Sequence, residues 1–263
     1  MARLPKRTLG DTVSGLVEME VRGHLAILSM RREAKRNAVD RHLADALDAA
    51  LNRLEDDPDL WVGILSGTRM VFSGGSDLSA GGDNRTERGG EYGLIRRARR
   101  KPLIAAVEGY ALGGGFEMVL ACDLVVAARD VTFGLPEVAR GVLPTSGGLF
   151  RGPRSLPLNV AREMILTGAR IDADRAERLG VVNLITEPGG AVDGAVGMAE
   201  AILANAPLSV QACVAAVGAI VGANDDEGWR ATSEAMGAVS GKSDTQEGVR
   251  AFLEKRSPMW SGR

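Results

Sequence analysis

The sequence predicts an α/β fold, and three observations support this prediction. Short apolar segments recur at 60–65, 102–107 and 124–128, as expected for buried strands. Helical patterns separate these segments, and buried strands that alternate with helices are typical of a sheet covered on both faces. The 263 residues are 45% apolar and 25% charged, which are ordinary values for a globular protein.

The composition excludes several classes of function. A net charge of −2 gives no general attraction to nucleic acid or to a membrane surface. Residues 1–20 contain no apolar run of the length that a signal peptide or membrane span needs, so we expect a cytoplasmic protein. HExxH, CxxC and GxSxG motifs are absent, so we expect no metal site and no serine triad. Cys122 and Cys213 are interpreted as small core residues in a reducing compartment.

Local signals define the first elements. Residues 16–21 and 25–30 flank a short turn and predict a β-hairpin. Asp40 is a good N-cap for a helix with apolar residues on one face, and Pro58 marks its end. Residues 79–93 are glycine-rich, charged and without periodicity, which makes them a candidate mobile loop.

The second half of the chain is mainly helical. Beyond residue 157 we expect only one further strand, at 181–185. The predicted division is a core at 1–200 followed by a helical region at 201–263. Residues near the starts of the last three predicted helices are Pro207, Glu227 and Asp244.

Two glycine-containing turns follow strands, at 74–77 and 113–115. Each can present a backbone N–H group to a ligand, because glycine allows a close approach and a helix N-terminus leaves donors unpaired. Two such donors on one carbonyl oxygen would stabilise an enolate-like oxyanion. For the turn at 113–115, the alternative is that the glycines only allow tight packing between a helix and a strand.

Two glutamates stand near these turns. Glu117 falls one turn inside the helix that follows 113–115, among apolar residues, and Glu137 follows a proline that fixes the start of a short helix. Desolvation would raise the pKa of a carboxyl group in such a place, as acid–base catalysis requires. The alternative for Glu117 is a solvated helix residue. If both glutamates face one substrate, they can move protons to and from adjacent carbons.

Taken together, the chain resembles the crotonase family, also called the enoyl-CoA hydratase/isomerase superfamily. The matching segments fall in family order and cover nearly the whole chain. They are RNAV (36–39), FSGGSDL (72–78), GYALGGGFE (109–117), CDLVVAA (122–128), FGLPEV (133–138), SGG (146–148), TGARIDADRAERLGVVN (167–183) and FLEKR (252–256).

The resemblance implies a spiral of ββα units with a helical C-terminal region that forms homotrimers, often paired into hexamers. It implies an oxyanion hole made by the backbone N–H groups of Ser76 and Gly114. Glu117 would deprotonate the water that adds to C3, and Glu137 would deliver a proton to C2. Family members with both glutamates are generally hydratases, whereas many isomerases keep only the second.

The resemblance also implies contacts with the acyl-CoA thioester, whose CoA is part of the substrate, so no separate cofactor is expected. In some relatives the C-terminal FxEKR segment of a neighbouring subunit touches the adenine and the 3′-phosphate. Two positions depart from the pattern, since Gly74 and Ser76 stand where alanine is frequent; Ser76 thus adds a hydroxyl group. The residues expected to bind substrate or CoA are Arg36, Ala38, Ser73, Asp77, Leu78, Phe252 and Lys255.

We therefore expect an enoyl-CoA hydratase that adds water reversibly, in the syn sense, to a trans-2-enoyl-CoA. One alternative is a carnitinyl-CoA dehydratase, which the segments AFLEKRSPMWSGR and LPEVARGVLPTSGG also resemble. That enzyme acts on a trimethylammonium substrate, which favours an aromatic or acidic pocket. Another alternative is an enoyl-CoA isomerase.

A different class of function is also represented among crotonase relatives, namely RNA binding or a non-catalytic scaffold. The basic run at 96–101 is the candidate for an RNA-binding stripe. A solvated helical face is a commoner explanation of such a run, and the acidic overall charge argues against RNA. The presence of both glutamates argues against a scaffold that has lost its activity.

Overall fold

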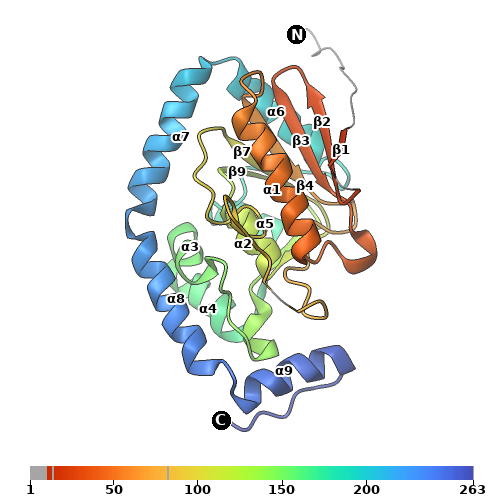
Figure 1. The fold of residues 1–263 in the computed structure, drawn as a ribbon, viewed down its shortest axis with the longest axis vertical. Helices are drawn as coiled ribbons and strands as arrows, with labels where there is room; N and C mark the ends of the chain where they lie inside the picture. The colour runs from red at the N-terminus through yellow and green to blue at the C-terminus, as the bar shows by residue number, and fades with distance from the viewer. Residues whose placement is uncertain (1–10, 14, 82, 263) are drawn as a thin grey trace.

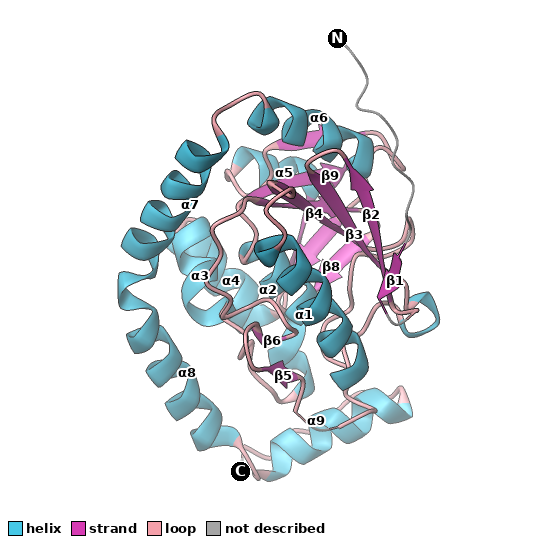
Figure 2. Ribbon diagram, turned by 45° about the horizontal axis from the view of Figure 1, so that its top comes forward, coloured by secondary structure: helices cyan, strands magenta, loops and turns pink. Residues whose placement is uncertain are grey.

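A sheet with the strand order β1-β2-β3-β4-β7-β9-β12 forms the frame of the molecule in this computed structural model (Figures 1 and 2). The structure describes residues 11–13, 15–81 and 83–262, so the first half of the N-terminal segment 1–20 analysed above lies outside it. The strands are Asp11–Val13 (β1), Val17–Arg22 (β2), Leu25–Met30 (β3), Val62–Ser66 (β4), Leu103–Val107 (β7), Leu124–Ala128 (β9) and Leu184–Thr186 (β12).

The predicted hairpin is present as β2 and β3, which pair antiparallel. From β3 onward every neighbouring pair in this sheet is parallel. Helix α1 (Arg41–Asp56) begins as predicted, because the side chain of Asp40 accepts a hydrogen bond from the N–H of Leu43 at 2.9 Å. The chain thus has the α/β architecture that its apolar segments predict.

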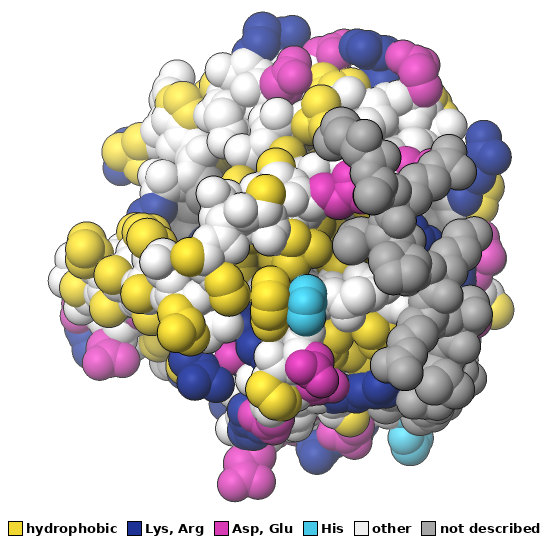
Figure 3. Space-filling model, turned by 90° about the horizontal axis from the view of Figure 1, so that it is seen from above, with side chains coloured by type: hydrophobic (Ala, Val, Ile, Leu, Met, Phe, Trp, Pro, Cys, Tyr) yellow, Lys and Arg dark blue, Asp and Glu magenta, His cyan; other side chains and the backbone are white. Residues whose placement is uncertain are grey.

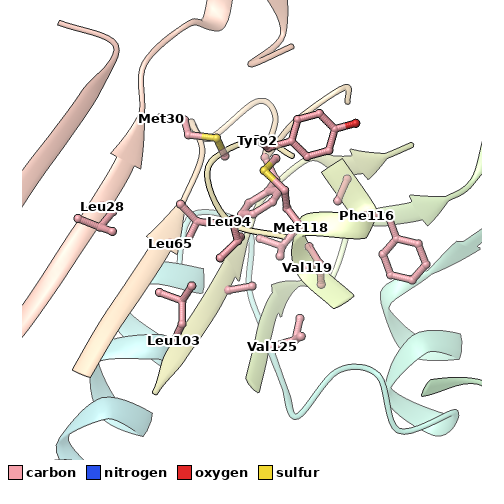
Figure 4. Packing of buried hydrophobic residues seen from close by; sticks show 14 of the residues in the cluster. Leu28, Met30, Leu65, Tyr92, Leu94, Leu103, Phe116, Met118, Val119 and Val125 are labelled. Atoms are coloured by element: carbon pink, nitrogen blue, oxygen red, sulfur yellow. The ribbon is translucent and has the colours of Figure 1, made fainter. Parts of the chain in front are cut away.

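The two faces of the sheet are covered by different helices. Alternate strand residues point to opposite faces, so Leu28 and Leu65 pack in the cluster that contains α1. Ile27 and Ile64 instead pack against α6 (Ala191–Leu203), through its buried alanines. Figure 4 shows the first cluster from nearby, where leucines of the strands meet side chains of α2 (Gly114–Leu120).

A second, smaller sheet has the order β11-β10-β8. Its strands are Arg170–Asp172 (β11), Thr132–Gly134 (β10) and Tyr110–Leu112 (β8). Beyond residue 157 the sequence predicted only one strand, so β11 is a correction. A strand of three residues, of which only Ile171 is buried, is too short to show an apolar alternation.

The remaining elements of the first two hundred residues are short. The predicted loop at 79–93 contains a small antiparallel pair, which holds its second half in place. The bounds are Glu33–Lys35 (η1), Arg85–Thr86 (β5), Gly90–Glu91 (β6), Pro136–Arg140 (η2), Gly148–Ser155 (α3), Leu158–Thr167 (α4) and Ala173–Arg178 (α5).

The last helices form an arm that runs down one side of the molecule and turns beneath it (Figure 1). The helices start near the residues predicted for them, and their bounds are Pro207–Val221 (α7), Gly222–Asn224 (η3), Asp225–Val239 (α8) and Ser243–Glu254 (α9). Helix α8 contacts α3, where Trp229 meets the ring of Phe150 edge-on, and α9 contacts η2. The arm therefore rejoins the core at its lower end.

Helix α7 has no buried residue within the chain. Within the helical run Pro207–Val239, an 18-residue window has a mean hydropathy of 1.5, which is high enough for a membrane span. One such helix is weak evidence, because core helices of soluble proteins pass the same test. In Figure 3, apolar side chains gather on α7, which projects to the left. Cys213 lies on this helix and is exposed, which corrects its assignment to the core.

The basic run at 96–101 does not form a free stripe. Arg97 is buried and pairs with Asp48, and Arg99 pairs with Asp123. The ammonium group of Lys101 donates to two backbone carbonyl groups at 2.6 and 2.7 Å. These cations bind helix α1 and Asp123, the residue directly before β9, so the basic run has a structural explanation.

Candidate active site

A pocket of about 450 Å³ lies where the turns after β8 and β10 meet the C-terminal arm. Its volume is within the range of small-molecule sites. Because β8 and β10 are parallel neighbours, with Leu112 opposite Gly134, the segments that follow them leave the small sheet side by side. The predicted residues that line the pocket are Ser76, Asp77, Leu78, Gly114, Glu117, Glu137 and Phe252.

The two predicted N–H donors come from turns that pack against each other. In the bridge between Val39 and Ser76, the hydrogen bonds use the N–H of Val39 and the N–H of Asp77. The N–H of Ser76 therefore points to the opposite side of its segment, because donors alternate along an extended chain. Gly114 is the first residue of α2, where an N–H has no acceptor within the helix.

The glycines in these turns are required by space. Gly75 has φ +91°, and a Cβ there would stand 2.8 Å from the N atom of Gly114. Gly113 has φ +58°, and a Cβ there would stand 3.1 Å from Oε1 of Glu137. At Gly75 a side chain would collide with the backbone of the other turn, and at Gly113 the positive φ disfavours any other residue.

Glu117 is buried, with 2% of its surface exposed. Its Oε1 atom accepts hydrogen bonds from the N–H of Ser146 at 2.7 Å and the N–H of Gly148 at 2.8 Å. These two donors fix the carboxyl group from one side. Burial and the neighbouring charge of Glu137 nevertheless raise the pKa of Glu117 to about 8, against the lowering effect of the two N–H donors.

Glu137 follows Pro136, which stands at the start of η2 as predicted. Its side chain is 9% exposed, and its Oε2 atom is buried without a hydrogen-bond partner among the described residues. Burial raises the pKa of Glu137 to about 7, although the backbone and Arg140 lower it. Two carboxyl groups with raised pKa values beside one pocket hold on average about one proton near neutral pH. Such a pair can give one proton and take another.

The other predicted CoA contacts fall into two groups. Asp77 and Leu78 line the pocket. Ser73 is fully buried, and its hydroxyl group donates to the carbonyl of Asn37 and accepts from the N–H of Gly75, so its side chain supports the turn from behind. Arg36, Ala38 and Lys255 are not among the lining residues; Arg36 and Lys255 are exposed and have positive φ.

Phe252 was expected to act on a neighbouring subunit. In this structure it lines the pocket of its own chain, together with Met236 and Val249 of the arm. The guanidinium group of Arg140 lies 4.7 Å from the centre of its ring. The arm thus adds apolar side chains to the pocket, whereas the core supplies the glutamates, the N–H donors and the remaining apolar lining.

Sequence reasoning missed Tyr92, which lies in the segment predicted as a mobile loop. The ring is 3% exposed and lines the pocket, and its hydroxyl oxygen lies 2.8 Å from Oγ of Ser76. A signal was available, because Tyr92 is one of only two tyrosines in the chain and stands between glycines in the sequence GGEYG. Among the residues that the structure describes, no group of three or more His, Cys, Asp or Glu side chains could hold a metal ion.

Comparison with known proteins identifies the class to which this fold and site belong. The sequence model described as "Enoyl-CoA hydratase/isomerase" matches residues 20–263. This chain therefore belongs to the enoyl-CoA hydratase/isomerase, or crotonase, family, and it is a hydro-lyase of that family.

Individual relatives carry two kinds of name. The chain is 38% identical to the carnitinyl-CoA dehydratase of Salmonella enteritidis PT4 over 240 residues, which are 87% of this chain and 92% of the relative. A crystal structure of carnitinyl-CoA hydratase from Mycobacterium avium matches with a TM-score of 0.90 and 38% identity, and covers 95% of this chain and 99% of the other. An enoyl-CoA hydratase from Mycobacterium tuberculosis H37Rv is 41% identical, with a TM-score of 0.76 and coverage of 95% and 100%.

Proposed function

We propose that the protein catalyses the reversible syn addition of water to a trans-2-enoyl-CoA. The observation that carries this proposal is the pair of buried glutamates, Glu117 and Glu137, beside two backbone N–H groups in one pocket. Hydration of a conjugated thioester needs these parts, namely a base, an acid and donors for the oxygen on which charge develops. No metal ion or separate cofactor takes part in the proposed reaction.

In the proposed mechanism the thioester oxygen accepts hydrogen bonds from the N–H groups of Ser76 and Gly114. The pKa of Glu117 is the higher of the two, so the reactive form is the one in which the proton shared by the pair stands on Glu137. In this form Glu117 is a carboxylate and takes a proton from water while the water oxygen forms a bond to C3. The electron pair of the C2–C3 double bond moves toward the thioester carbonyl and gives the enolate. Glu137 then donates a proton to C2, which restores the carbonyl. Proton exchange returns the pair to its singly protonated state.

Dehydration of carnitinyl-CoA is the second candidate, because several relatives carry that name. Apart from Glu117 and Glu137, the carboxylates that line the pocket argue for a neutral acyl chain, since Asp40, Asp77 and Glu91 each already have a cationic partner. Arg32 pairs with both Asp40 and Asp77 at 2.8 Å, and Glu91 pairs with an arginine at 3.0 Å. Although burial opposes it, hydrogen bonds from Ser79 and Arg32 lower the pKa of Asp77 to about 2, as expected for a compensated carboxylate.

The arm suggests the assembly. We propose a homotrimer, which can pair into a hexamer, held in part by the exposed apolar face of α7. Leu208 is 78% exposed and Ile220 is 75% exposed, and burial of such side chains against another copy would stabilise the assembly. The region 201–263 would then be the trimerisation region. The proposed location is the cytoplasm, and the proposed contacts of the CoA moiety include Arg36, Ala38 and Lys255.

The test follows the absorbance of the enoyl thioester. Crotonyl-CoA, a longer trans-2-enoyl-CoA and crotonobetainyl-CoA are compared as substrates for the wild-type protein, Glu117→Gln and Glu137→Gln. Glu177→Gln is the matched control, because Glu177 is exposed on α5. We expect the first two changes to lower kcat by at least 100-fold with each substrate that turns over. Turnover of crotonobetainyl-CoA alone would select the second candidate, and full activity of either pocket variant would refute the mechanism.

A further inference from the structure

Tyr92 lines the pocket, but the proposed mechanism gives it no role. Its ring packs in the hydrophobic cluster that contains Met118, and Figure 4 shows its oxygen turned away from the apolar side chains. The hydroxyl oxygen lies 2.8 Å from Oγ of Ser76. Ser76 is the residue whose side chain departs from the alanine that is frequent in the family, so this contact gives its hydroxyl group a partner.

The same ring also lies against the other N–H donor. A Cβ at Gly114 would stand 2.3 Å from the hydroxyl oxygen of Tyr92 and 2.5 Å from the ring carbon that carries it. Tyr92 therefore fills the space directly beside Gly114. One side chain thus contacts both residues whose backbone N–H groups form the proposed oxyanion hole.

The backbone holds Tyr92 in this place by several interactions. Its φ is +59°, a conformation that a bulky residue adopts only where the surroundings impose it. Its N–H donates to the carbonyl of Asn84 at 3.1 Å. The preceding residue, Glu91, is buried and forms ion pairs with Arg85 at 2.9 Å and Arg96 at 3.0 Å. These contacts hold the backbone of Tyr92 and of the residue before it.

We propose that Tyr92 is a positioning residue that braces the oxyanion hole, with its hydroxyl group hydrogen-bonded to Ser76 and its ring packed against Gly114. The inference rests on the proposed function, since it concerns the donors of that reaction. Burial and the charge of Glu117 raise the pKa of Tyr92, so the hydroxyl group keeps its proton at neutral pH.

The first test is a double-mutant cycle on kcat for hydration of crotonyl-CoA. Tyr92→Phe and Ser76→Ala each remove one partner of the hydrogen bond, and Ser76→Ala keeps the backbone N–H. We expect each single variant to lower kcat about tenfold with KM changed less than threefold, because bound substrate loses alignment with its donors. The double variant should be no worse than the poorer single variant. Tyr110→Phe, the change at the other tyrosine, should match the wild type.

Independent effects that multiply in the double variant, or a Tyr92→Phe protein with wild-type kcat, would overturn the brace. A second measurement does not depend on turnover. The absorbance of bound trans-2,4-hexadienoyl-CoA shifts to longer wavelength when its carbonyl oxygen is polarised by the N–H donors. We expect the shift to be smaller in Tyr92→Phe and Ser76→Ala than in the wild type and Tyr110→Phe.

The spectral measurement separates the two proposals. A wild-type protein that shows the shift but hydrates no enoyl-CoA would refute the proposed function, and the variants would still test the brace. An equal shift in the wild type and Tyr92→Phe would refute the brace and leave the hydratase proposal intact. A wild-type protein that neither shifts the absorbance nor hydrates would refute both.

Discussion

Replacement of Glu137 by glutamine should stabilise the protein while it removes activity. The carboxyl group has an ordinary pKa of 4.5, and burial raises it to about 7. Ionisation in the folded state is therefore penalised by about 3 kcal/mol relative to the unfolded chain. Because the pKa is raised in the folded state, the free energy of unfolding of the wild type falls as the pH rises from about 4.5 to 7. Glutamine does not ionise, so the free energy of unfolding of the Glu137→Gln protein does not fall in this pH range through this group.

The assay is thermal unfolding of the wild type and Glu137→Gln at pH 5 and pH 8, at equal protein concentration. We expect the variant to gain less than about 1 kcal/mol at pH 5 and about 3 kcal/mol at pH 8. The gain at pH 8 corresponds to a Tm higher by roughly 6–12 °C for a chain of this size. Glu177→Gln should show no such pH dependence. An equal gain at both pH values, or a variant less stable than the wild type at pH 8, would refute the argument from burial.

Further predictions concern the pocket and the arm. Turnover should follow a bell-shaped pH profile, because the glutamate pair loses its base as pH falls below about 7 and its acid as pH rises above about 8; a profile flat from pH 6 to 9 would contradict this. Gly114→Ala should lower kcat at least 100-fold in the absorbance assay, since its Cβ collides with Tyr92, whereas Gly197→Ala, where the space is open, should be harmless. Ile220→Glu should reduce the mass measured by light scattering to that of smaller species; an unchanged mass would exclude this face from the interface. Phe252→Ala should raise KM several-fold with kcat preserved, because it removes part of the pocket wall only.

The sequence predicted the elements that local chemistry determines. The first helix is one example, because its cap at Asp40 and its apolar face are encoded within a few residues. The burial of Glu117 is another, since the residues around it are apolar. The family resemblance then brought Ser76, Gly114 and Glu137 into one site, and the structure shows that these residues line one pocket.

Other features depend on contacts between distant residues and could not be predicted in this way. The strand Arg170–Asp172 exists because it pairs with β10, and its three residues carry no pattern of their own. Tyr92 is placed in the pocket by its positive φ and by the ion pairs of the neighbouring Glu91, and hydrophobic periodicity in the sequence reveals neither. The exposure of Cys213 reflects an apolar helix without cover in its own chain, whereas apolar composition alone suggested a core position.

The division of the pocket between the core and the arm also affects how the protein matures during synthesis. The glutamates and N–H donors lie within the first 137 residues, but Met236, Val249 and Phe252 are among the last to leave the ribosome. A nascent chain that has folded its sheets therefore holds the reactive groups in a cleft that still lacks the apolar side chains of the arm. Retention of a CoA ester would then distinguish finished chains from incomplete ones.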